Sequence, residues 1–253
     1  MCIRDSLGVA LTFFQKDVLV VDANLTTSHL GFYFGMYFFP ITLPSVLSGK
    51  ARVDEAIYRH FSGVRILPSS IDLKNALDAK IRKIRPTFQK IKRYSEITLV
   101  DCAPGFGKES TSVLKASDEI LIVSTPDITS LIDTKKLIEL SRELNKKIVG
   151  IVLNRVRFSP FEITKKEFEK ECGEKVLVEI PESSLFKKSL FVRQPAIVIE
   201  KDGLIAEKFK VLAAKILNES YIPKRFDNVG EKVKLYLKTL GRDFIILLRK
   251  NLI

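Results

Sequence analysis

The sequence has few of the residues that form disulfide scaffolds and metal centres. Its 253 residues include three cysteines, two histidines and no tryptophan. Cys2, Cys102 and Cys172 form no CxxC pair, so the sequence predicts neither a disulfide framework nor a zinc or iron–sulfur site. His29 and His60 stand alone, and a surface or loop position explains each of them better than catalysis does.

Long apolar runs and a secretion signal are also missing. No stretch approaches the roughly 20 apolar residues of a membrane-spanning helix. The opening MCIRDSLGVALTFF has Asp5 beside Arg4 in its charged part and no small-residue cleavage site after its apolar part, which excludes a typical signal peptide. We therefore expect a cytoplasmic location.

The composition is that of an ordinary globular protein with an excess of positive charge. Hydrophobic residues make up 46% and charged residues 28% of the chain, whose net charge is +12. The length suits one α/β domain with a full core. The positive charge is compatible with nucleic acid, with an anionic membrane surface or with simple solubility, so its position along the chain matters more than its sum.

Short runs rich in valine and isoleucine alternate with longer helical patterns. The predicted strands are residues 18–22, 64–68, 97–101, 119–124, 148–154 and 176–180. The predicted helices are residues 73–94, 128–144, 160–172, 185–192 and 203–217. Continuous apolar strands separated by helices indicate an α/β fold, in which a mostly parallel sheet carries helices on both faces. Ligands of such sheets bind at the carboxyl ends of the strands.

Two of the predicted strands end in an aspartate followed by a polar turn. Asp101 ends the strand of ITLVDCAPGFGKES, and the turn after it contains Gly105. An aspartate at this point can hold a magnesium-bound water, and the Pro-Gly turn can present backbone N–H groups to a phosphate. Asp22 ends VLVVD in the same way, with Asn24 two residues later. The alternative is a plain strand end whose aspartate caps the next turn.

Two further strand ends carry a carboxamide and a carboxylate. Asn154 and Arg155 end the strand of IVGIVLNRV, and Pro181 and Glu182 follow the last predicted strand. Because a carboxamide both donates and accepts hydrogen bonds, Asn154 suits the edge of an adenine ring. Strands also end in Asp, Asn or Pro where no ligand binds, and the pattern alone leaves that alternative open.

Six short segments, taken in chain order, resemble the motifs of one protein family. DAN, LPSS, DCAPG, TPDITSLIDTKKL, VLNRV and IPES resemble the MinD/ParA family of deviant-Walker P-loop ATPases, of the SIMIBI type. MinD-type proteins are the most similar, and the resemblance runs from about Leu7 to about Leu217. It implies ATP and Mg²⁺ as cofactors, a homodimer, and ATP hydrolysis by the full-length protein.

The resemblance also implies roles for the strand ends. Asp101 matches the aspartate that holds the magnesium shell in catalysis, and Gly105 matches the glycine that senses the γ-phosphate. The residues that match nucleotide-contacting strand ends and the loop over the base are Asp22, Asn154, Arg155, Pro181 and Glu182. The segment from Asp127 to Lys136 matches the surface that faces the second subunit and a regulatory partner protein.

The sequence departs from the family in the loop after residue 22. The family usually reads Asp-x-Asp there, and the second aspartate helps to position the attacking water. Asn24 stands at that place and is the matching catalytic residue. Because an amide can orient a water but cannot accept its proton, we expect slow hydrolysis.

The larger departure is at the N-terminus. LGVALTFF matches the back half of the helix that follows the Walker A loop KGGxGKT, whereas MCIRDS matches nothing in the family. We therefore expect a truncated chain in which residues 1–6 are non-native and residues 7–220 are the nucleotide-binding domain. Roughly two dozen residues, enough for one strand, the phosphate loop and a helical turn, are expected to be missing. In this form the chain would bind ATP poorly or not at all.

The last segment, residues 221–253, reads as a linker and a basic amphipathic tail. It carries eight lysines and arginines against three acidic residues. Its apolar residues at helical spacing include Val233, Leu237, Leu240, Phe244, Leu247 and Leu248. Such a helix at a chain end is typical of an anchor on anionic lipids, as in MinD-like proteins. The alternative is a last helix docked on its own domain.

Three functions remain open on the sequence alone. The first is a MinD-like ATPase that positions cell-division or other polar machinery, bound reversibly at the inner face of the cell membrane. The second is a ParA-like partition ATPase that contacts DNA through the basic cluster at residues 80–93, for which a solvated helix face is the simpler explanation, so nucleic-acid binding is not expected. The third is a membrane scaffold that works without nucleotide, supported by Asn24 alone.

Overall fold

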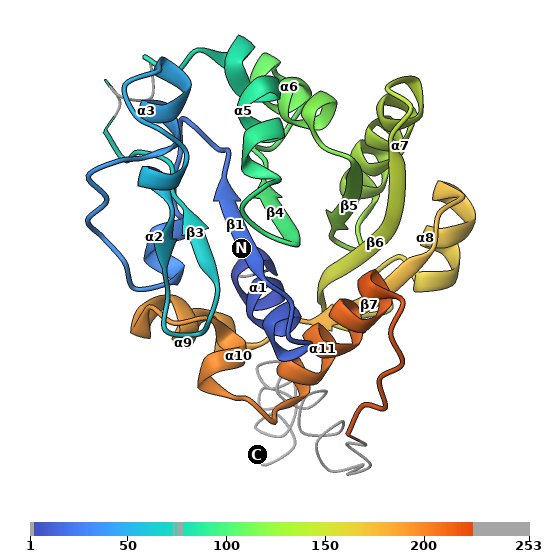
Figure 1. Ribbon diagram of the computed structural model, residues 1–253. Coiled ribbons are helices and arrows are strands. Elements are labelled where there is room, and N and C mark those ends of the chain that lie inside the picture. The colour runs from blue at the N-terminus through green and yellow to red at the C-terminus, as the bar shows by residue number, and fades with distance from the viewer. Residues whose placement is uncertain (1–2, 73, 75–77, 225–253) are drawn as a thin grey trace, which may run out of the picture.

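The computed structural model describes residues 3–72, 74 and 78–224 (Figure 1). The residues predicted to face a membrane lie outside this part of the chain, namely Val233, Leu237, Leu240, Phe244, Leu247 and Leu248. Among the described helices, none has the length and apolar character needed to cross a membrane.

Seven strands form two sheets in the described part of the chain. The first sheet has the order β2-β3-β1-β4 and consists of β1 (Val18–Asp22), β2 (Tyr58–Arg59), β3 (Arg65–Leu67) and β4 (Ile97–Asp101). The second has the order β5-β6-β7 and consists of β5 (Glu119–Ser124), β6 (Lys147–Val156) and β7 (Val176–Pro181). All pairs are parallel except the short hairpin of β2 with β3. The six predicted strands are confirmed, whereas β2, with two residues, is too short to show a pattern.

The sheet that the sequence predicts as one is divided between β4 and β5. These two strands do not pair, and they lie opposite each other in Figure 1. All five residues of β4 are half-buried and Glu119 in β5 is exposed, whereas every residue of β1 is buried. Because a strand inside a parallel sheet pairs on both sides, β4 and β5 are two sheet edges.

Helices α1 (Ile3–Phe13) and α11 (Leu204–Leu217) join the two sheets through one core. Their side chains pack with buried residues of both sheets. Leu11 and Phe209 of these helices are completely buried in a cluster with Val20 of β1 and Val152 of β6. The division between β4 and β5 therefore does not split the molecule into two separate cores.

The other helices cover the remaining faces. The face of β1 opposite α1 is covered by α3 (Leu43–Ser48), α5 (Ile84–Ile91) and α6 (Lys108–Ala116). The second sheet packs against α7 (Ile128–Glu143) and α8 (Lys165–Cys172). The remaining elements are α2 (Leu30–Tyr33), the 3-10 helix η1 (Asp54–Ala56), α9 (Ser184–Val192) and α10 (Ala196–Ile199). The helices predicted at residues 128–144, 185–192 and 203–217 are confirmed as α7, α9 and α11.

The helix predicted at residues 73–94 is shorter in the structure. Its described part begins as the 3-10 helix η2 (Ile81–Lys83) and continues as α5, which ends at Ile91. Pro86 lies in the first turn of α5, where it lacks an N–H and its ring crowds the carbonyl four residues earlier. The proline therefore favours a helix start shortly before it. Residues 73 and 75–77 fall outside the described part of the chain.

The helix predicted at residues 160–172 also begins later, at the first residue of α8. The Thr164 side chain accepts a hydrogen bond from the N–H of Glu167, whose carboxylate bonds back to the N–H of Thr164. This capping box satisfies the free N–H groups at the helix start and fixes its position. The apolar spacing of Phe161 and Ile163 extends the helical pattern into a loop, which explains the error.

Helix α1 begins at Ile3, inside the segment MCIRDS. Asp5 and Ser6 in its first turns are completely buried, and one carboxylate oxygen of Asp5 has no hydrogen-bond partner among the described residues. Burial raises the pKa of Asp5 to about 6. A carboxyl group in such a place destabilises the fold when it is ionised.

Replacing Asp5 with alanine is expected to stabilise the protein at neutral pH. A rise in pKa from 3.8 to about 6 corresponds to about 3 kcal/mol, at about 1.4 kcal/mol per unit. Because the folded state holds this proton more tightly than the unfolded state, Asp5 lowers the stability of the unmodified chain as pH rises from about 4 to about 6, and Asp5→Ala removes this part of the pH dependence while other buried carboxyl groups keep theirs.

Urea unfolding at several pH values between about 4 and 7 measures this difference. Ser141→Ala is the matched control, since Ser141 of α7 is equally buried, does not titrate in this range and bonds to the backbone oxygen of Leu137 rather than to Asp5. An Asp5→Ala chain whose stability falls with pH as steeply as that of the unmodified chain, or that is less stable at neutral pH, contradicts the prediction.

Candidate functional site

Asp22 and Asp101 lie side by side at the carboxyl ends of neighbouring strands. They are paired in the register of β1 and β4, and the N–H of Ala23 donates to the backbone oxygen of Asp101 at 2.9 Å. Burial raises the pKa of Asp101 to about 6, Arg4 lowers it, and the nearby Asp22 adds to the rise. The fold thus brings together two carboxyl groups whose ionised forms a bound cation would stabilise.

The carboxylate of Asp22 organises the loop after β1. It accepts hydrogen bonds from the Ser28 hydroxyl at 2.8 Å and from the backbone N–H groups of Asn24 and Leu30 at 3.2 Å and 3.3 Å. Burial raises the pKa of Asp22 in spite of these bonds. They are the contacts of an aspartate that caps a turn, and a contact between Asp22 and nucleotide stays a prediction.

Asn24 lies half-buried in the same loop. Its side-chain oxygen accepts hydrogen bonds from the N–H and the hydroxyl of Thr27 at 3.1 Å and 3.0 Å. The N–H of the next residue, Leu25, donates to the carboxylate of Glu109 in α6 and so ties this loop to the helix after β4. Because its oxygen is engaged in the turn, the amide nitrogen is the part of Asn24 that can contact a ligand.

Arg4 of helix α1 pairs with the carboxylate of Asp101. Its Nη1 atom lies 2.8 Å from Oδ2 of Asp101, and its guanidinium lies over the ring of Tyr33, 5.2 Å from the ring centre. The two charged side chains are only 17% and 20% exposed, and Nε of Arg4 has no hydrogen-bond partner. The guanidinium therefore contacts the carboxylate at which the family resemblance places magnesium, and a cation would compete with it.

The exposed loop from β4 to α6 turns at Gly105. This residue has a φ of +84°, a left-handed conformation that favours glycine. A Cβ atom here would meet no heavy atom within 4 Å. The backbone angle requires the glycine, whereas packing does not, and the space around it is open to a ligand.

The ends of β6 and β7 form a second group of predicted site residues. The register of the two strands shifts between Asn154 and Val156, and Arg155 in this bulge has a φ of +59°. Asn154 is 3% exposed, and its side-chain oxygen has no hydrogen-bond partner. An unpaired buried oxygen and a positive φ in an arginine both cost free energy, and such features are concentrated at functional sites. The amino group of a purine would satisfy this oxygen.

Glu182 follows directly on β7 and borders the same corner. Its N–H donates to the backbone oxygen of Val156 at 2.9 Å, and its carboxylate pairs with Arg155 at 3.5 Å and with Arg157. The hydrogen bond from Arg157 holds the pKa of Glu182 below its usual range. Pro181, the last residue of β7, is buried and pairs with Val156. The four residues predicted to surround a base are thus brought together.

The two groups of residues belong to different sheets. Asp22 and Asp101 end strands of the first sheet, and the corner at Asn154 ends strands of the second. The division between β4 and β5 lies between them (Figure 1). The sequence predicts one ligand-binding edge, whereas in the structure the predicted residues are divided between two sheets.

The segment predicted to face partners begins at helix α7. Asp127 caps this helix by accepting a hydrogen bond from the N–H of Ser130 at 2.9 Å. Burial acts to raise the pKa of Asp127, but this bond and those from neighbouring hydroxyls hold it well below its usual range. Ile128 and Ile132 in the first turns of α7 are 61% and 47% exposed. A firmly capped helix with exposed isoleucines suits a partner surface, and the partner itself stays a prediction.

Comparison with known proteins identifies the family. A sequence profile of the ParA family, described as NUBPL iron-transfer P-loop NTPase, matches residues 88–217. The chain is 31% identical to "Uncharacterized ATP-binding protein MJ0547" of Methanocaldococcus jannaschii over 219 residues, which are 87% of this chain and 83% of that protein. The chain belongs to the MinD/ParA family of P-loop ATPases.

Two solved structures of MinD resemble the whole described fold. The Pyrococcus furiosus cell division ATPase MinD has a TM-score of 0.83 and 30% identity, over 86% of this chain and 92% of that chain. The septum site-determining protein MinD of Pyrococcus horikoshii, complexed with Mg-ADP, has a TM-score of 0.82 and 29% identity, over 85% and 89%. The predicted α/β fold and family are confirmed, and nucleotide with Mg²⁺ is typical of this family.

The residues of this member fit a magnesium nucleotide in two respects. The paired carboxyl groups of Asp22 and Asp101 suit a hydrated cation, and the unpartnered oxygen of Asn154 suits an adenine amino group. Arg4 opposes the fit, because its guanidinium already neutralises Asp101. The iron-transfer description of the matching profile finds no support in the cysteines, which form no CxxC pair.

Arg4 and Glu109 are parts of the site that the sequence does not predict. Arg4 belongs to MCIRDS, which lies outside the family pattern, so nothing in the motif order points to it. Glu109 stands in α6, a helix that is not among those predicted from the sequence. The charge of each residue close to a predicted ligand-binding loop is the signal that could have indicated them.

Proposed function

We propose that this protein is a MinD-like ATPase that dimerises with ATP and binds membranes reversibly through its tail to position cell-division or other polar machinery. The pairing of Asp22 with Asp101 at the strand ends carries the proposal. It is supported by the unpartnered oxygen of Asn154 at the end of β6. Carboxylates for a hydrated cation and an unpartnered carboxamide oxygen for a base are what a strand edge must offer to MgATP.

The residues of the site would then have distinct roles. Bound Mg²⁺ supplies positive charge that stabilises the phosphates during hydrolysis. Asp101 would hold a water of the magnesium shell, and Asn24 would orient the attacking water through its amide nitrogen. Asn154 would accept a hydrogen bond from the adenine amino group, and Pro181 and Glu182 would lie over the base.

We further propose that a strand and a Walker A loop belong upstream of Leu7 and that residues 1–6 are non-native. Two observations support this. β4 and β5 each keep an unpaired edge in the middle of an otherwise parallel arrangement, as expected where a strand between them is missing. Asp5 is buried with an unpartnered oxygen, a local conflict of the kind that natural sequences avoid.

Membrane binding is tested by sedimentation with phosphatidylcholine vesicles that contain phosphatidylglycerol. We expect the double variant Leu237→Glu, Phe244→Glu to bind roughly tenfold or more weakly, because two apolar contacts with the lipid are lost. Thr239→Glu with Asn251→Glu adds the same charge outside the apolar set and serves as the control. Equal binding of both variants would overturn the tail anchor.

A nucleotide-independent membrane scaffold is the second candidate, favoured by the ion pair between Arg4 and Asp101. It predicts the same vesicle binding with and without MgATP, even after a Walker A segment is added. A ParA-like role on DNA gains less support. Lys92, one of the cations proposed to contact phosphates, is paired with Asp118.

A further inference from the structure

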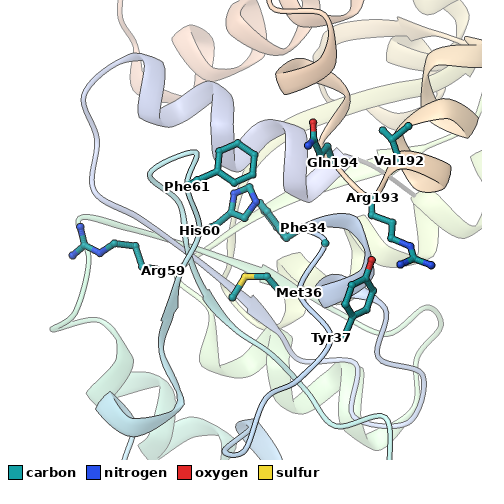
Figure 2. A pocket seen from close by; sticks show the side chains of 10 residues that line it. Phe34, Met36, Tyr37, Arg59, His60, Phe61, Val192, Arg193 and Gln194 are labelled. Carbon is teal, nitrogen blue, oxygen red and sulfur yellow. The ribbon is translucent and has the colours of Figure 1, made fainter.

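A group of exposed apolar side chains surrounds a cavity on the surface of the first sheet. Phe61, in the turn between β2 and β3, is 72% exposed. At the end of α9, Leu190, Phe191 and Val192 are 48%, 86% and 42% exposed. Phe61 and Val192 both line one cavity of about 430 Å³ (Figure 2), so the turn and the helix end form a continuous surface. We call these four side chains the apolar rim.

The surroundings of the apolar rim are positively charged. Lys187 and Lys188 of α9 and Arg193 directly after it are exposed, and no acidic residue occurs between positions 183 and 199. Arg59 adds a fourth cation on the side of the turn, and the lining of the cavity contains no carboxylate. Within the described residues none of these four cations forms an ion pair. Their charge is therefore available to an external anion.

The cavity lining also places a cation where a phosphate can reach it. His60 of the lining is 5% exposed and its Nε2 atom is buried, so the imidazole forms part of the cavity wall and does not contact a ligand. Arg193 lies over the ring of Tyr37 in the same lining (Figure 2), 4.8 Å from its centre.

The apolar rim lies on the side from which the chain continues toward its tail. The hydroxyl of Thr12, near the end of α1, lies 3.4 Å from the backbone oxygen of Ser62, next to Phe61. The ring of the adjacent Phe13 packs edge-on against Tyr221, shortly before the last described residue. Figure 1 accordingly shows α9, α10 and the C-terminal end of α1 at the same end of the molecule.

We propose that this surface is a second membrane contact, which rests on the proposed membrane-binding function and adds the globular domain to it. Phe61 and Phe191 enter the headgroup region of an anionic bilayer, Lys187 and Lys188 approach lipid phosphates, and the cavity beside His60 receives a headgroup. Exposed aromatic residues flanked by cations have this chemistry in interfacial membrane proteins. Once one of two weak contacts is bound, it holds the other close to the membrane at a high effective concentration. The molecule therefore binds the membrane more strongly than either contact would alone.

The test uses the full chain and vesicles of phosphatidylcholine with and without phosphatidylglycerol. The variant Phe61→Ser, Phe191→Ser is expected to lose roughly tenfold in binding to the anionic vesicles, since two exposed aromatic side chains no longer enter the lipid. Lys187→Gln, Lys188→Gln is expected to lose binding and part of its salt dependence. Phe161→Ser is the matched control, because Phe161 is 95% exposed in the loop before α8. All these side chains are exposed, so thermal unfolding should not change.

The outcomes separate this inference from the proposed function. If the rim variants bind as the unmodified chain does while the tail variants lose binding, the proposal of a second contact is wrong and the tail anchor stands. If the rim variants lose binding and the tail variants do not, the globular contact stands and the tail anchor falls. A change in molecular mass by light scattering in the rim variants, with vesicle binding unaltered, would show that the surface pairs two protein molecules and would overturn the lipid contact.

Discussion

A chain that carries a parallel strand, a KGGxGKT loop and one further helical turn upstream of Leu7, in place of residues 1–6, is expected to bind MgATP at least roughly a thousandfold more tightly than the chain of 253 residues. Two or three charge-assisted hydrogen bonds to the phosphates, at about 1.5–3 kcal/mol each, account for a factor of this size. Removal of Arg4 adds to the gain, because its guanidinium no longer neutralises Asp101.

Isothermal titration with ATP and Mg²⁺ measures this difference. The control is the same extended chain with alanine at the lysine of the added loop, which keeps the strand and removes the charge on the phosphates. Asp101→Asn in the extended chain should abolish the magnesium dependence, since a neutral amide is a poor ligand for a hydrated cation. Equal ATP binding by the extended and the present chain would refute the proposed truncation.

Asn24→Asp in the extended chain is expected to raise ATP turnover roughly tenfold to a hundredfold, because a carboxylate at this place can accept the proton of the attacking water. The structure allows the change. The side-chain oxygen of Asn24 accepts from the N–H and hydroxyl of Thr27, and a carboxylate keeps both bonds. Steady-state phosphate release under saturating MgATP measures the effect.

Thr27→Val separates chemistry from loop geometry in this experiment. It removes one hydrogen bond to the side-chain oxygen at position 24 and leaves the residue there unchanged. We expect it to alter turnover far less than Asn24→Asp does. A turnover typical of fast family members in the Asn24 chain, with no gain from aspartate, would mean that position 24 does not limit hydrolysis.

The sequence predicts the strands better than the helices, and the reason is visible in two places. β1 and β6 each contain a buried apolar run, at residues 18–21 and 150–153, so their pattern is read directly from side-chain chemistry. The starts of α5 and α8 depend instead on Pro86 and on the capping box of Thr164, which act on the backbone over a single turn. Because the apolar spacing continues past these local signals, it places both helix starts too early.

The order of the motifs indicates the right site residues, but it does not indicate the side chains that pair with them. Asp22 pairs with Asp101, and Arg155 and Glu182 meet at one corner, as the resemblance implies. The ion pair of Arg4 with Asp101 and the unpartnered oxygen of Asn154 depend on three-dimensional packing, which no spacing encodes. The division of the sheet likewise depends on which strands lie next to each other in space.

The free edges of β4 and β5 also bear on how this chain behaves during expression. Each edge presents a row of backbone N–H and C=O groups without a strand partner, and β4 carries apolar side chains that are only half-buried. Such edges are templates for strands of other molecules, and they promote aggregation. A peptide with the sequence of the proposed upstream strand would act on this chain as a chaperone does, by occupying both edges and keeping the protein in solution.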